Sequence, residues 1–100
     1  MKDANSAPVY ACMYKGLAEL SREHGYALAA HGSMARDFDV VAIPWVDHPD
    51  PAESLIDAIL DKYALNQIGE PEMKNHGRKC WTLSLGFGDT FLDFSIMPFE

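Results

Sequence analysis

Apolar residues recur at three- and four-residue intervals in two stretches of the chain, which is the spacing of one helical face. The first stretch comprises Tyr10, Met13, Leu17, Leu20 and His24. It predicts a helix over residues 8–24, with Gly25 as a left-handed C-terminal cap. The second comprises Leu55, Ile56, Ile59, Leu60 and Tyr63. We expect this helix to begin with Asp50 as N-cap, Pro51 at its first position and Glu53 three residues after the cap.

The remaining apolar segments predict four strands. Residues 26–30 form a short apolar run bounded by glycines, typical of a buried strand, and a turn is expected over Gly32–Arg36. Residues 38–45 are apolar on both faces, which predicts a central strand. Residues 79–85 alternate, and a short turn at 86–89 leads into residues 90–97, so these two segments predict a hairpin. Residues 68–77 are polar and contain glycine and proline, and are expected to form a loop.

These elements follow one another in the order αββαββ. The arrangement that buries them most simply is an α+β two-layer sandwich, with two helices on one face of a four-stranded mixed sheet. A chain of 100 residues has room for one hydrophobic core, so we expect a single domain over 1–100, with residues 1–7 as a flexible N-terminus.

The net charge of the chain disfavours some classes of binding partner. Eight basic residues against fifteen acidic ones give a formal charge of −7, and the basic residues are scattered along the sequence. This disfavours direct nucleic-acid binding. No apolar run approaches the roughly 20 residues of a membrane span, and the N-terminus resembles no secretory signal, so a cytoplasmic protein without membrane contact is expected. Cys12 and Cys80 are then reduced and are expected to be buried.

Three aspartates stand out from the other acidic residues. Asp37 and Asp39 are two positions apart at the start of a predicted strand, so their side chains leave the same face of the sheet. Asp93 stands alone in an apolar strand, where an unpaired carboxylate is costly. If the two strands are neighbours, the three carboxylates lie close together. Their oxygens are hard ligands of the kind that suit Mg²⁺. The remaining acid, including Glu70 and Glu72, is interpreted as solvated surface.

Structural roles are the alternative for each aspartate. Asp37 can serve as a turn residue, and Asp39 can pair with Arg36 or Arg78. Asp93 can pair with Arg78 or with His31, or face solvent on an edge strand.

A glycine and a serine precede these aspartates. Gly32 after a strand allows backbone N–H groups to approach a phosphate, and the hydroxyl of Ser33 adds a donor. Gly32-Ser33, then Asp37-x-Asp39, then Asp93 on a later strand together resemble the motif of the polymerase-β-like nucleotidyltransferases, including their minimal antitoxin-type members. The resemblance implies that Gly32 and Ser33 hold nucleotide phosphates. It also implies that Asp37, Asp39 and Asp93 bind Mg²⁺ as the catalytic and metal residues.

The spacing within this motif is shorter than is usual in the family. Only Met34, Ala35 and Arg36 separate Ser33 from Asp37, which predicts a tight hairpin where family members have a helical turn. The sequence therefore leaves open whether the protein is an active nucleotidyltransferase or a catalytically inactive relative.

A second resemblance covers nearly the whole chain. The segments 31–33, 36–39, 42–45, 76–78 with Trp81, and 92–98 are similar to short proteins encoded by tailed phages and prophages. That similarity transfers no activity, but it implies a bacterial cytoplasm during infection or lysogeny.

Three further residues are candidates for phosphate binding. Arg78 can bind two phosphate oxygens at once through its guanidinium, and its alternative is an ion pair with one of the three aspartates. His31 precedes the Gly-Ser pair. His76 lies together with Arg78 in the segment that leads into the strand predicted at residues 79–85. His31 and His76 lack the spacing of a transition-metal motif.

Two functions follow from these residues. The first is a minimal nucleotidyltransferase-like phage protein that binds Mg²⁺ and a nucleotide. The alternative is a non-catalytic, acidic interaction protein that binds a host or phage protein, with a role in counter-defence. The sequence leaves open whether the protein is a monomer or, through an exposed edge strand, a homodimer.

Overall fold

The computed structural model describes residues 7–32, 37–87 and 89–99. Ser33 and the rest of the turn predicted at Gly32–Arg36, except Gly32, lie outside this range. So do residues 1–6 of the N-terminus that was expected to be flexible over residues 1–7, whereas Ala7 begins the first helix. The elements in chain order are α1 (Ala7–Glu23), β1 (Tyr26–His31), β2 (Asp37–Pro44), α2 (Ala52–Tyr63), β3 (Asn66–Met73), the short 3-10 helix η1 (Asn75–Gly77), β4 (Lys79–Ser84) and β5 (Phe91–Ile96).

The five strands form one mixed sheet in the order β1-β2-β5-β4-β3. β2 and β5 are parallel, and the other neighbouring pairs are antiparallel. The α+β architecture is confirmed, but the prediction of four strands is wrong. Residues 66–73 form a fifth strand at the edge of the sheet, where a glycine, a proline and polar side chains are tolerated because one side of the strand is unpaired.

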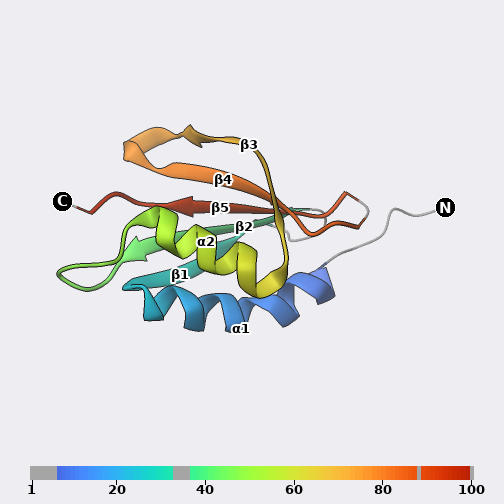
Figure 1. Ribbon diagram of the computed structural model, residues 1–100, viewed down its shortest axis with the longest axis horizontal. Coiled ribbons are helices and arrows are strands. Elements are labelled where there is room, and N and C mark those ends of the chain that lie inside the picture. The colour runs from blue at the N-terminus through green and yellow to red at the C-terminus, as the bar shows by residue number, and fades with distance from the viewer. Residues whose placement is uncertain (1–6, 33–36, 88, 100) are drawn as a thin grey trace.

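Both helices pack on one face of the sheet, and Figure 1 shows α2 in front of the strands, roughly along their direction, and α1 beside β1. Apolar side chains that point to this face form a single core with the helices: Tyr10, Leu17, Leu55, Ile59, Phe38, Val40, Leu83, Leu92 and Phe94 are fully buried. Tyr10 stacks on Phe38 at a centroid distance of 5.2 Å and accepts a hydrogen bond from the backbone N–H of Phe91. No helix of the described part of the chain covers the other face, which we call the open face.

The ends of the first helix and strand agree with the sequence only in part. Gly25 takes a left-handed conformation (φ +92°) after α1, as predicted. β1 is an edge strand with mostly exposed side chains, so the expectation of a buried strand is wrong. The hydroxyl of Tyr14 on α1 donates to the carbonyl oxygen of Leu28 at 2.6 Å, which ties the helix to this strand.

The start of α2 differs from the predicted cap. Pro51 is the N-cap, without a side-chain capping hydrogen bond, and the helix begins at Ala52. The carbonyl oxygen of Asp50 instead accepts a hydrogen bond from the hydroxyl of Tyr26 at 2.7 Å. Glu53 points toward the sheet and pairs with Lys79 at 3.1 Å.

Two further features concern the whole chain. Cys12 is exposed and Cys80 is half-buried, so the prediction that both thiols are buried is wrong. Among the described helices, none combines the length and the apolar character needed to cross a membrane.

Candidate functional site

The open face carries a row of polar side chains that runs across four strands. The register of the sheet aligns His31 on β1, Asp39 on β2, Asp93 on β5 and Thr82 on β4. Asp39 and Asp93 are direct partners in the parallel pair, so their side chains leave the same face on strands about 4.8 Å apart. The structure thus brings together two of the three predicted carboxylates.

Asp37 begins β2 and lies on the open face, two residues before Asp39. Its register partner on β5 is Phe91, so it is diagonal to Asp93 rather than beside it. Its side chain is exposed and does not line the pocket that contains the other two aspartates. Its negative charge nevertheless contributes to raising the pKa of Asp93.

The electrostatics of Asp93 reflect this crowding. Its pKa is raised from 3.8 to about 6, first by burial, then by a hydrogen bond with Asp39 and by the negative charges of Asp39 and Asp37. A hydrogen bond with Thr82 opposes the shift. Two neighbouring carboxylates repel each other, so this pair favours a proton or a cation between its oxygens.

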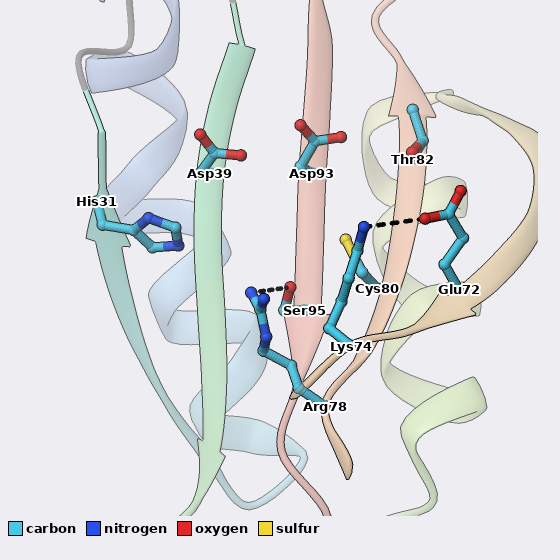
Figure 2. A pocket seen from close by; sticks show the side chains of 9 residues that line it. All are labelled: His31, Asp39, Glu72, Lys74, Arg78, Cys80, Thr82, Asp93 and Ser95. Carbon is cyan, nitrogen blue, oxygen red and sulfur yellow. Dashed lines mark hydrogen bonds and ion pairs between the residues drawn. The ribbon is translucent and has the colours of Figure 1, made fainter. Parts of the chain in front are cut away.

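A pocket of about 330 Å³ extends from this row along the open face. Its lining consists of His31, Asp39, Glu72, Lys74, Arg78, Cys80, Thr82, Asp93 and Ser95. Figure 2 shows the carboxylates of Asp39 and Asp93 side by side toward one end, while Arg78 and Lys74 extend from the other. The pocket therefore has an acidic and a basic end.

Arg78 is positioned as the sequence predicted, but its partner is not a carboxylate. Its Nη1 donates to Oγ of Ser95 at 3.1 Å, and Ser95 is buried between the strands that flank it. No ion pair joins Arg78 to an aspartate within the described residues. The alternative role, in which Arg78 forms an ion pair with one of these aspartates, is therefore not observed among the described residues.

Gly32 directly follows β1 and lies next to the carboxylate of Asp39. Its φ of +83° is a left-handed conformation, and a Cβ at this position would lie 3.1 Å from Oδ2 of Asp39. Glycine is thus required here by both the backbone conformation and the close approach of the carboxylate. His31 lines the pocket, whereas His76 lies exposed in η1 and is not among the lining residues.

Five residues that line the pocket are not predicted as site residues from the sequence: Glu72, Lys74, Cys80, Thr82 and Ser95. Lys74 and Glu72 were assigned to a loop and to solvated surface, but β3 and the turn that follows it carry both into the pocket. Ser95 also lines it. Alternation along residues 91–96 could have placed Ser95 on the same face as Asp93, but no local pattern indicated where β3 lies.

The acidic side chains of the pocket can be compared with the ligands of known kinds of metal site. Among residues 7–32, 37–87 and 89–99, no three or more histidine, cysteine, aspartate or glutamate side chains form a metal-binding group. The pair of Asp39 and Asp93 still fits Mg²⁺, which is commonly held by one or two carboxylates and completes its shell with water and substrate phosphates.

Comparison with models of known protein families and with curated proteins finds no match to this chain.

Proposed function

We propose that this protein is a minimal nucleotidyltransferase-like domain of the tailed-phage type, which binds Mg²⁺ and the phosphates of a nucleotide on the open face of its sheet. The observation that carries the proposal is the direct pairing of Asp39 with Asp93 across parallel strands. Asp37 on the same face and Gly32 against Asp39 support it, because the motif resemblance assigns roles to these same residues.

The roles of the residues follow from charge. Asp39 and Asp93 would hold the cation, and Asp37 adds negative charge nearby. The cation, when bound, supplies neutralisation of phosphate oxygens. Arg78 would bind those oxygens, since its guanidinium presents five N–H donors and, among the described residues, one of them is used in the hydrogen bond to Ser95.

The raised pKa of Asp93 sets the pH range for this function. The pKa of Asp93 is about 6, so cation binding must displace a proton as the pH falls toward that value. We expect Mg²⁺ affinity to be highest above pH 7 and to weaken progressively below pH 6.

Calorimetric titration of Mg²⁺, and of ATP with Mg²⁺, tests the proposal. Wild type and the control Asp57→Asn, an exposed site on α2, should give saturable heats, and Asp39→Asn should give none. Heats absent from wild type, or equal in Asp39→Asn, would overturn the metal site. Pyrophosphate released from ATP with Mg²⁺ would distinguish an active transferase from an inactive, nucleotide-binding relative.

One observation favours the alternative function, a non-catalytic protein that binds a host or phage protein. A groove of about 570 Å³ at the far end of the open face is lined by Val41, Ile43, Pro44, Met97, Pro98 and Phe99. Ile43 and Phe99 are 44% and 52% exposed, which is high for such side chains. Under this alternative, neither Mg²⁺ nor ATP produces heat.

A further inference from the structure

We propose that the turn from Lys74 to Arg78 is the element that binds the phosphate chain. In the absence of phosphates, Glu72 forms an ion pair with Lys74, and a bound phosphate would replace the carboxylate of Glu72. This inference rests on the proposed function and deepens it. It names oligophosphates as the ligand class of the basic end of the pocket and identifies Lys74, Glu72 and Ser95 as parts of the site.

The backbone of the turn directs both cations into one pocket. The N–H of Lys74 donates to the carbonyl oxygen of Arg78 at 2.6 Å, which closes the turn. Two consecutive residues inside it, His76 and Gly77, have positive φ values of 65° and 73°. This tight reversal brings Lys74 and Arg78 to neighbouring positions on the pocket wall.

Arg78 is held in place before any ligand binds. Ser95 is 2% exposed, and its hydroxyl accepts a hydrogen bond from the guanidinium at 3.1 Å. One N–H of the guanidinium is used in this contact, and the planar group keeps donors for the paired hydrogen bonds that phosphate oxygens accept. A preorganised arginine loses less conformational entropy on binding.

The ammonium group of Lys74 already forms an ion pair with a carboxylate, that of Glu72. Its Nζ lies 2.9 Å from Oε2 of Glu72, and both side chains are substantially exposed, at 42% and 73%. An exposed ion pair contributes little stability, so a ligand with a higher charge can displace Glu72. The carboxylate therefore marks the position that a phosphate oxygen would take.

The acidic and basic ends are close enough to act together. Ser95, which anchors Arg78, is two residues from Asp93 on the same strand, a separation of about 7 Å. A cation on Asp39 and Asp93 and a phosphate on Arg78 would be neighbours. Without the cation, the two carboxylates repel the phosphate, so removing one of those charges should tighten metal-free binding.

The test is an NMR titration of ¹⁵N-labelled protein with inorganic tripolyphosphate in EDTA, at pH 7.5 and fixed ionic strength. Saturable shifts are expected at the amides of Lys74, Arg78 and Ser95. Arg78→Gln should weaken binding at least tenfold, while Glu72→Gln should tighten it about two- to fivefold. The matched control is Glu70→Gln, an exposed glutamate of the same strand outside the pocket, which should leave the affinity unchanged.

Two more arms complete the design. Asp93→Asn should bind tripolyphosphate about two- to fivefold more tightly than wild type. ATP should bind within about threefold of tripolyphosphate if the turn recognises phosphates alone. Binding of ATP without tripolyphosphate binding would contradict phosphate recognition by the turn.

The inference is overturned if neither wild type nor Asp93→Asn gives saturable shifts, or if Glu72→Gln behaves as Glu70→Gln does. The comparison of the two glutamate variants remains decisive even if Arg78→Gln fails to fold. All arms contain EDTA, so they do not depend on Mg²⁺. Anion binding can therefore fail while the metal site stands, or hold while the Mg²⁺ titration fails.

Discussion

Asp39 on β2 and Asp93 on β5 are register partners in the parallel pair of strands, and both line the pocket on the open face of the sheet. The apolar residues on either side of each aspartate point to the opposite face and are buried beneath the helices. The core therefore fixes the position of both carboxylates, and their mutual repulsion is the cost of that arrangement. A proton or a cation between them relieves it.

Burial of the Asp93 carboxylate, together with this repulsion, predicts that ionised Asp93 destabilises the fold at neutral pH. The pKa of Asp93 is about 6 in the folded protein and near 3.9 when unfolded, so the folded state binds more protons between these values. The free energy of unfolding should therefore fall as pH rises from about 4 to about 6.5. Asp93→Asn should raise it at pH 7 by about 1 kcal/mol, less than the full shift implies because solvent screens a half-exposed carboxyl.

Urea unfolding at several pH values between 4 and 7.5 measures this effect. The Asp93→Asn variant should show a weaker pH dependence than wild type, and Asp57→Asn should retain the full dependence. If Asp93→Asn is less stable than wild type at pH 7, the account of the pair is wrong.

Gly32 and Gly69 form a natural pair of controls. Both have positive φ, but a Cβ at Gly32 would lie 3.1 Å from the Asp39 carboxylate, whereas one at Gly69 meets nothing within 4 Å. Each change to alanine should lower the free energy of unfolding by about 1–2 kcal/mol through backbone strain. Only Gly32→Ala should also weaken Mg²⁺ binding in calorimetry, because it displaces Asp39. Equal Mg²⁺ affinity in both variants would argue that Asp39 is not a ligand.

The two cysteines report on occupancy of the basic end. Cys80 lines the pocket next to Lys74 and Arg78, whereas Cys12 is exposed on α1. Saturating tripolyphosphate should slow alkylation of Cys80 by iodoacetamide, because the anion covers the sulfur and disfavours the reactive thiolate. Alkylation of Cys12 should not change. Mass spectrometry of the two peptides measures both rates, and equal slowing at both sites would count against a bound anion in the pocket.

The fold could be predicted where apolar periodicity was strong. The two helices and the β4–β5 hairpin follow from it, as does the alternation that places Asp37 and Asp39 on one face. β3 could not be predicted, because an edge strand with most of its side chains exposed carries little hydrophobic alternation and can contain Pro71. Its position depends on pairing with β4, which is a tertiary contact.

Some residues of the candidate site could likewise be predicted from the sequence, and others could not. The isolated position of Asp93 in an apolar strand indicated that it needs a partner, and Asp39 lies beside it. Lys74 and Glu72 could not be placed, since they reach the pocket only through β3 and its turn. Lys74 and Arg78 are only four residues apart in sequence, and the interpretation of the basic residues as scattered overlooked the turn that brings both side chains to one pocket wall.

The most direct test of the central claim is the location of a divalent cation by NMR with Mn²⁺, a paramagnetic ion that prefers the same oxygen ligands as Mg²⁺. At substoichiometric Mn²⁺, the amide signals of residues 37–40 and 92–94 should broaden first, and Asp39→Asn should abolish the effect. Broadening that is strongest at the exposed acidic residues of α2, such as Asp57 and Asp61, or that persists unchanged in Asp39→Asn, would contradict a cation site at Asp39 and Asp93.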